Sequence, residues 1–157
     1  MITTSTQDSS LAKRLQRETT AEVLFDEFSR GLYSTDASIY QIKPLGVVVP
    51  KTEEDVLATI SIANDTGVSV TMRGGGTSQC GQTVGDGIII DVSKHLNRLI
   101  SVDPEKRGVV VQPGIVLDQL NALLKPPSLF FPVDVSTSTR PPIVVITPFH
   151  TSGTPSL

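Results

Sequence analysis

The sequence of 157 residues has no tryptophan, only one cysteine and few aromatic residues of any kind. A single cysteine cannot form a disulfide within the chain and suits a reducing compartment, so we expect a cytoplasmic protein. The apolar runs are all shorter than the ~18 residues that a membrane-spanning helix needs. Met1 to Ser10 is polar and lacks the apolar segment of a secretory signal. Two histidines far apart, with one cysteine, give no pattern of metal ligands.

The chain also lacks an excess of positive charge. It has 13 Lys and Arg against 16 Asp and Glu, which gives a formal net charge of -3. A protein that binds nucleic acid through its phosphates normally carries a basic surface, so nucleic acid is not an expected partner. Hydrophobic residues make up 38% of the chain, enough for the core of one domain or of a piece of a larger protein.

A glycine-rich segment between two β-branched runs is the most informative stretch. It reads TMRGGGTSQCGQTVGDG over Thr71–Gly87, after the run Val68–Met72 and before Ile88–Val92. Glycine permits positive φ, so successive N–H groups can turn toward one anion, and hydroxyl, amide and guanidinium groups can add donors. Neither the P-loop nor the Rossmann fingerprint matches, because no lysine is present and the loop leads into a strand. The residue types alone leave phosphate binding and a simple wide hairpin loop equally open.

Capping residues and periodicity predict the elements of the first half. Residues 1–18 are expected to be a flexible segment with a short helix near Leu11–Arg17. Thr19–Glu22 has the form of a capping box that opens a helix ending at Gly31. The apolar face predicted for that helix consists of Leu24, Phe25 and Phe28. Pro44–Pro50 predicts one strand, which a helix and the strand Val68–Met72 then follow as a βαβ unit with parallel strands.

The helix within this βαβ unit has its own signals. Thr52–Asp55 resembles a second capping box, and Gly67 is expected to end the helix. Its predicted apolar face consists of Val56, Leu57, Ile60 and Ala63.

The second half predicts a different organisation, which begins at about Ile88 and consists mainly of antiparallel strands. Residues 99–102 and 108–112 fit a hairpin, and Leu117, Leu120 and Leu124 mark a helix. The predicted fold class is therefore α+β with two small sheets. Residues 141–157 are rich in proline and are expected to form a poorly ordered tail.

Four pieces of the sequence together resemble the N-terminal FAD-binding domain of the vanillyl-alcohol-oxidase/PCMH flavoproteins, in their D-lactate and glycolate dehydrogenase branch. The pieces are YSTDASIYQIKPLGVVVPKTEEDV, VSVTMRGGGTSQCGQTVGDGIIIDVS, VVVQPGIVLDQLNALL and FFPVDVSTSTR. They follow the family's order and spacing over roughly residues 30–140. The resemblance implies a PCMH-type FAD-binding domain over residues 19–140, incomplete at its C-terminus, with a divergent tail over residues 141–157.

The resemblance also implies a set of cofactor-binding residues. Those expected to wrap the FAD pyrophosphate are Arg73, Gly74, Gly75, Gly76, Thr77, Ser78, Gly81 and Gln82. Pro50 is expected near the adenosine, and Pro113 and Gly114 are expected to let the backbone pass close to the cofactor. Pro132, Val133 and Asp134 are expected toward the flavin. Thr77 occupies the position at which some relatives carry a histidine bonded to the flavin, so FAD is expected to bind noncovalently.

The implied activity is that of an FAD-dependent oxidoreductase, in which a hydride passes from a 2-hydroxy acid such as D-lactate or glycolate to the flavin. Pro141 and Pro142 stand where the family continues with a glycine pair, and the substrate domain is missing. No catalytic residue is therefore assigned, and this polypeptide alone is expected to show little turnover. Two alternatives remain, a truncated fragment without activity and a nucleotide-phosphate-binding module without a redox role. His95, Cys80, Asp91 and Asp118 are expected to serve surfaces, loops or turns rather than chemistry.

Overall fold

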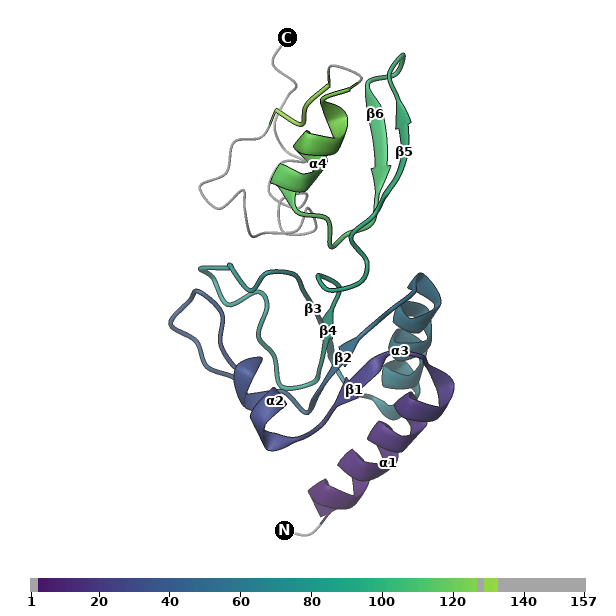
Figure 1. The fold of residues 1–157 in the computed structure, drawn as a ribbon. Helices are drawn as coiled ribbons and strands as arrows, with labels where there is room; N and C mark the ends of the chain where they lie inside the picture. Colours follow the sequence, from purple (N-terminus) through teal and green to yellow (C-terminus); the bar gives the residue numbers. More distant parts are fainter. Residues whose placement is uncertain (1–2, 127–128, 133–157) are drawn as a thin grey trace.

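The computed structural model describes residues 3–126 and 129–132 (Figure 1). The elements in chain order are α1 (Thr3–Glu18), β1 (Glu22–Leu24), α2 (Glu27–Leu32), β2 (Gly46–Val49), α3 (Glu53–Thr66), β3 (Val70–Arg73), β4 (Ile88–Asp91), β5 (Leu99–Asp103), β6 (Gly108–Val111) and α4 (Leu117–Leu124). A four-stranded sheet has the order β1-β2-β4-β3, and β5 pairs with β6 in a separate two-stranded sheet. Figure 1 shows this second sheet, with α4 beside it, beyond one end of the first. The predicted α+β class with two small sheets is confirmed.

β4 lies at the centre of the larger sheet. It pairs in parallel with β2 on one side and with β3 on the other, whereas β1 pairs antiparallel with β2 at the edge. The predicted parallel orientation of β2 and β3 is confirmed. The predicted change to antiparallel strands at Ile88 is wrong, because that change comes only at β5. All four residues of β4 are buried, as expected for a central parallel strand covered on both faces.

Alternate side chains of the central strands build two apolar clusters on opposite faces of the sheet. Val48, Ile88 and Ile90 pack with residues of α1 and α3 on one face. Val47, Val49 and Ile89 form the core of the other face, against which Leu24 and Tyr33 pack. Figure 1 shows α1 and α3 together on one side of the strands and α2 on the other. Each fully buried aliphatic side chain contributes about 1.5–3 kcal/mol relative to an exposed one, so these two layers hold the strand ends in place.

The N-terminal segment is more ordered than the sequence predicts. α1 spans Thr3–Glu18 rather than a short stretch near Leu11–Arg17. Leu11 and Leu15 lie one helical turn apart. Both are buried in the apolar cluster to which Ile62 and Ala63 of α3 also belong. The helix is therefore longer than predicted, and two leucines on one face dock it onto the sheet. The flexibility of residues 1–18 stays a prediction.

The predicted capping box at Thr19–Glu22 does not open a helix. These residues lead into β1, because Val23 and its neighbours find backbone partners along β2. The N–H of Thr20 donates to the carboxylate of Asp55 over 2.7 Å, and Glu22 accepts from Lys94 and pairs with His95. α2 begins later, after Asp26, whose side chain accepts from the N–H of Ser29 over 2.9 Å. Contacts distant in sequence thus replace the local ones that the motif predicts, and Gly31 lies inside α2 rather than after its end.

The start and the end of α3 are as predicted, but its inward face is not. Thr52 and Asp55 form a reciprocal capping box, and Gly67 ends the helix with a φ of 66°. Leu57 is 68% exposed and Ile60 43% exposed, whereas Thr59 and Ile62 are buried. The inward face follows Asp55, Thr59 and Ile62 because the buried carboxylate of Asp55 is anchored by donors from three backbone N–H groups.

The hairpin β5–β6 and the helix α4 form as predicted, and they pack against each other apart from the larger sheet. Ile115, Leu120 and Leu124 pack against apolar side chains of the hairpin. A bulge interrupts the pairing between Leu99 and Ser101. The predicted tail at residues 141–157 lies outside the described residues. Among the described helices, none combines the length and the apolar character that crossing a membrane requires.

Candidate functional site

The carboxyl ends of three parallel strands bring predicted site residues to one edge of the sheet. Pro50 follows β2 directly and is buried. Arg73 ends β3 and lies in register with Asp91, which ends β4. The glycine-rich loop, residues 74–87, begins at this edge and returns to the start of β4. The prediction that the loop leaves from the carboxyl end of its strand is confirmed, and ligands of open α/β sheets bind at such edges.

Two glycines of the loop have left-handed backbone conformations. Gly76 has a φ of 65° and Gly81 a φ of 73°. A Cβ atom on Gly76 would lie 2.5 Å from Nη2 of Arg73, and one on Gly81 would lie 2.6 Å from the Tyr40 ring. At both positions a side chain would strain the backbone and force the neighbouring side chain to move.

The first half of the loop carries donors without protein partners. Within the part of the chain that the structure describes, no hydrogen bond involves the N–H groups of Gly74, Gly75, Gly76 or Thr77. Gly74 is buried, Gly76 and Thr77 are half-buried, and Gly75 is exposed. A buried backbone N–H group requires an acceptor, and consecutive unpaired N–H groups beside left-handed residues suit an anion.

Ser78 organises the second half of the loop. Its Oγ accepts from the N–H groups of Cys80 and Gln82, both over 3.2 Å, and the residue is 8% exposed. These two N–H groups are consequently engaged within the loop. The Gln82 side chain is exposed, and Cys80 is a free, exposed cysteine.

The guanidinium of Arg73 lies under the loop rather than extending from it. Nη1 donates to the carbonyl of Thr83 over 3.2 Å, and Nη2 donates to the carbonyl of Thr35 over 2.9 Å. The guanidinium carbon lies 5.1 Å from the centre of the Tyr33 ring, which is cation–π geometry. Arg73 therefore joins the loop to residues 33–41, in addition to placing a positive charge beside the free N–H groups.

A second contact joins the same two segments. The hydroxyl of Thr83 donates to Oδ2 of Asp36 over 3.0 Å, and the other oxygen of Asp36 accepts from the N–H and the hydroxyl of Ser38. Partial burial acts to raise the pKa of Asp36, but the hydrogen bonds from Ser38 and Thr83 outweigh burial and hold the pKa below its usual value. The carboxylate thus stays ionised beside the loop at neutral pH.

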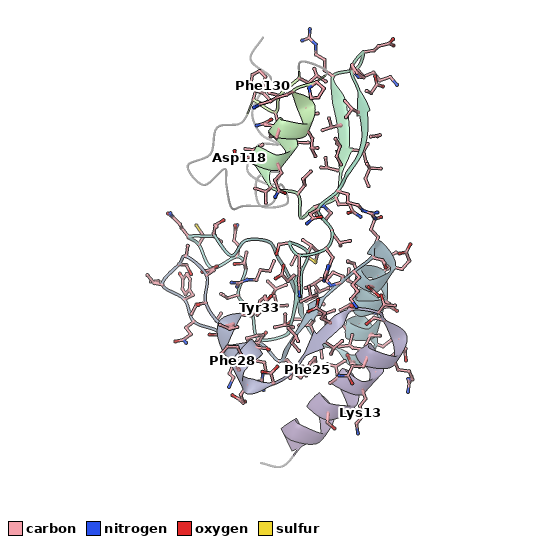
Figure 2. All side chains as sticks on the ribbon, viewed as in Figure 1. Lys13, Phe25, Phe28, Tyr33, Asp118 and Phe130 are labelled. Carbon is pink, nitrogen blue, oxygen red and sulfur yellow. The ribbon has the colours of Figure 1, made fainter. Side chains whose placement is uncertain are left out.

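Tyr33 and Asp91 form a hydrogen-bonded pair beneath the loop. The Tyr33 hydroxyl donates to Oδ2 of Asp91 over 2.6 Å, and Oδ1 accepts from the N–H and the hydroxyl of Ser93. Asp91 is only 8% exposed, so it does not lie on a solvated face, whereas its bonds to Ser93 fit the expected role in a turn. Burial, followed by the hydrogen bond to Asp91, raises the pKa of Tyr33. Figure 2 labels Tyr33 within the lower part of the molecule, which contains the larger sheet.

Tyr33 and Asp91 were not predicted as site residues, although the sequence contains a signal for Asp91. Asp91 ends the run Ile88–Ile90, and a carboxylate directly after a buried strand must find donors. Nothing local to Tyr33 indicates its partner, because the two residues lie 58 positions apart.

Some of the remaining predicted residues lie at this edge of the larger sheet, and others lie beside the β5–β6 hairpin and α4. Pro113 and Gly114 lie against the turn that follows β4, where the N–H of Gly114 donates to the carbonyl of Leu96 over 2.6 Å. Pro132 is exposed and lines a cavity of about 600 Å³ with residues of β6 and α4. Figure 2 labels Phe130, which lines the same cavity, and Asp118, which is exposed, in the upper part of the molecule. Val133 and Asp134 lie outside the described residues.

His95, expected to serve a surface or a turn, has a structural contact. Its Nε2 lies 2.8 Å from Oε1 of Glu22, and this pair joins the turn after β4 to β1. Within the described ranges, no group of His, Cys, Asp and Glu could hold a metal ion.

Known proteins match most of this chain, and the matched region includes the glycine-rich loop. A family model described as "FAD binding domain" matches residues 44–145. D-2-hydroxyglutarate dehydrogenase of Escherichia coli (strain K12) is 46% identical over 110 residues, which are 68% of this chain and 11% of the relative. Glycolate oxidase subunit GlcD of Bacillus subtilis (strain 168) is 33% identical over 118 residues, which are 72% of this chain and 25% of the relative.

Among solved structures, p-cresol methylhydroxylase superposes with a TM-score of 0.63 at 18% identity. The match covers 79% of this chain and 25% of that chain, and it shows a shared fold. The sequence spans about a ninth of the length of the D-2-hydroxyglutarate dehydrogenase and a quarter of the other two proteins.

Proposed function

Because this chain belongs to the FAD binding domain family, we propose that its glycine-rich loop holds the diphosphate of FAD. The observation that carries the proposal is the run of four N–H groups, from Gly74 to Thr77, that lack protein partners at the carboxyl edge of the sheet. A diphosphate supplies the acceptors that these groups lack, and the charge of Arg73 beside them favours an anion.

The other predicted residues take places around this centre. The half-buried hydroxyl of Thr77 and the exposed amide of Gln82 supply further donors, while Ser78 and Gly81 fix the shape of the loop. Pro50 and the turn at Pro113 and Gly114 border the same edge and approach the cofactor through backbone. The assignment of Pro132, Val133 and Asp134 toward the flavin stays a prediction.

We infer that this domain, together with a substrate domain, serves the oxidation of a 2-hydroxy acid. D-2-hydroxyglutarate dehydrogenase and glycolate oxidase are among the relatives by name. Bound FAD supplies the acceptor of the hydride. The residues of this chain bind the diphosphate and orient the cofactor, and none of them is assigned a catalytic role. We therefore expect little or no turnover of D-lactate or glycolate from the 157-residue chain, which a dye-linked assay of the purified chain measures.

We further infer that FAD binds noncovalently, since Thr77 carries no nucleophile that commonly bonds to a flavin. Acid precipitation of the loaded chain should leave all flavin absorbance in the supernatant, and yellow precipitate would contradict this inference. The single cysteine is consistent with a cytoplasmic location, and the net charge of -3 is consistent with the absence of a nucleic-acid partner.

Titration with three ligands tests the proposed function. FAD and ADP both carry a diphosphate, whereas FMN carries the flavin with a single phosphate. We expect the chain to bind FAD more tightly than ADP, and ADP more tightly than FMN, by calorimetry at one fixed salt concentration. Equal affinities for FAD and ADP would favour a nucleotide-phosphate-binding module without a flavin role. Binding of none of the three would favour a fragment without a ligand and overturn the proposal.

A further inference from the structure

We propose that Tyr33 and Asp91 are positioning residues for the glycine-rich loop, because they hold Arg73 where it fixes the loop for its ligand. The inference rests on the proposed function only for the identity of that ligand. Neither residue is hydrogen-bonded to the segment from Gly74 to Thr77, whereas the Arg73 side chain contacts both Tyr33 and the loop.

The first step is the immobilisation of Asp91. Its carboxylate is buried at the end of the central strand, and three donors from Tyr33 and Ser93 satisfy its two oxygens. A buried carboxylate with short hydrogen bonds to both oxygens has a fixed orientation, since any other orientation leaves charge unsolvated. The phenol oxygen of Tyr33 is thus held 2.6 Å from a fixed point.

The second step is the placement of the Tyr33 ring. The ring packs against the apolar cluster of Val47, Val49 and Ile89 on one face of the sheet. The guanidinium of Arg73 lies over the same ring. With its hydroxyl fixed and its ring packed, Tyr33 provides a rigid surface on which the guanidinium rests.

The third step passes from Arg73 to the backbone of the loop. The guanidinium bonds the carbonyls of Thr35 and Thr83, so it sets the distance between the loop and residues 33–41. Nη2 also occupies the space where Gly76 would carry a Cβ, so the left-handed turn at Gly76 closes around the guanidinium. A shift of Arg73 would therefore redirect the N–H groups on either side of Gly76.

Two substitutions that each remove one hydroxyl from the same carboxylate provide the matched test. Tyr33→Phe keeps the ring but removes the donor to Oδ2 of Asp91, whereas Ser93→Ala removes one of the two donors to Oδ1 and leaves the N–H of Ser93 in place. Arg73→Lys removes the guanidinium that bonds two carbonyls but keeps the positive charge. Its control is Arg107→Lys, which changes an exposed arginine of the β5–β6 turn.

Amide hydrogen exchange on the 157-residue chain without cofactor reads out the loop. In Tyr33→Phe and Arg73→Lys, we expect the Cys80 and Gln82 N–H groups to exchange about tenfold faster, while those of Val48 and Ile90 exchange as in the wild type. In Ser93→Ala and Arg107→Lys, the loop should exchange as in the wild type. Equal effects of Tyr33→Phe and Ser93→Ala on the loop, or a change that includes Val48 and Ile90, would indicate a merely structural role and overturn the inference.

A second arm measures FAD affinity in the same variants. We expect Tyr33→Phe and Arg73→Lys to weaken FAD about tenfold, and Ser93→Ala to leave the affinity within about twofold of the wild type. A wild-type chain that binds no FAD would overturn the proposed function alone, because the exchange comparison still decides the positioning role. Faster loop exchange with unchanged affinity in a chain that binds FAD would overturn the positioning role.

Discussion

Arg73 and Asp91 lie directly opposite each other in the register of β3 and β4, yet no ion pair joins them in the described part of the chain. The hydroxyl of Tyr33 donates to the carboxylate of Asp91, and the face of its ring contacts the guanidinium of Arg73. Among the described residues, the guanidinium of Arg73 is therefore bonded only to neutral carbonyl oxygens. An arginine paired with a carboxylate would present little net charge to a ligand, whereas this one keeps its charge.

The first prediction concerns salt. Because the charge of Arg73 is not neutralised, we expect the affinity for ADP to fall when NaCl is raised, with a several-fold loss between ~50 and ~500 mM. Arg73→Gln should make the affinity nearly independent of salt, and Arg73→Lys should retain the dependence despite weaker binding. Calorimetric titration at several salt concentrations gives these slopes. The control Arg107→Gln should behave as the wild type, and a salt dependence unchanged in Arg73→Gln would show that the charge acts elsewhere.

The second prediction concerns the left-handed turn. Gly76→Ala forces a Cβ against the guanidinium of Arg73 and places alanine at a φ of 65°. We expect the binding free energy of FAD to weaken by about 1–3 kcal/mol, which is a roughly tenfold or greater loss of affinity. Gly31→Ala is the matched control, since Gly31 lies inside α2 with no atom within 4 Å of an added Cβ. That control should stabilise the fold by about 0.5–1 kcal/mol in urea unfolding. Equal affinities for FAD in the two variants would contradict the role of Gly76.

The third prediction concerns acid. Burial acts to raise the pKa of Asp55, but hydrogen bonds from Thr20, Lys51 and Thr52 outweigh burial and lower the pKa below its usual value. The stability that Asp55 contributes is therefore complete above the ordinary Asp pKa of about 3.9 and is lost as pH falls through the lowered value. Asp55→Ala should cost about 2–4 kcal/mol at pH 7 and less near pH 2, as measured by urea unfolding.

The control for Asp55 lies in the same helical turn. Glu53 is exposed, and Glu53→Ala should change the free energy of unfolding by less than about 1 kcal/mol at either pH. If Asp55→Ala cost as much at pH 2 as at pH 7, packing rather than the ionised carboxylate would be responsible.

The fourth prediction concerns the N-terminal helix. Leu15→Ala empties a fully buried position that joins α1 to the cluster beneath α3, and we expect it to cost about 2–5 kcal/mol. Leu57→Ala removes a leucine that is 68% exposed, and we expect a change within about 0.5 kcal/mol. Urea unfolding of both variants measures the difference. Two small and equal effects would show that α1 is not held by Leu15 and would favour the expected flexible segment.

Patterns that are satisfied locally were predictable from the sequence. The capping box of Thr52 and Asp55, the end of α3 at Gly67 and the α4 leucines each depend on neighbours within a few residues, and the structure confirms them. The resemblance to an FAD-binding domain is confirmed as well, since the family model matches residues 44–145 and the fold is shared with p-cresol methylhydroxylase. The position of the glycine-rich loop followed from the strand before it.

Features that depend on distant partners were not predictable. Thr20 bonds a carboxylate 35 residues away, and Tyr33 bonds one 58 residues away, so local motifs suggested other roles for both segments. The four buried residues of β4 did contain a signal, since a short, continuous apolar run is typical of a central parallel strand. For Arg73, the sequence indicated the charge but not the two carbonyls that hold it under the loop.

The order β1-β2-β4-β3 has a consequence for how this chain acquires its shape. β2 and β3 are both synthesised before β4, but neither can pair with the other, since β4 must enter between them. Until residues 88–91 arrive, β3 has no strand to join, and the segment after it is tethered at one end only. Closure of residues 74–87 and completion of the sheet are therefore one event, so the receptacle for the ligand forms together with the parallel sheet and not after it.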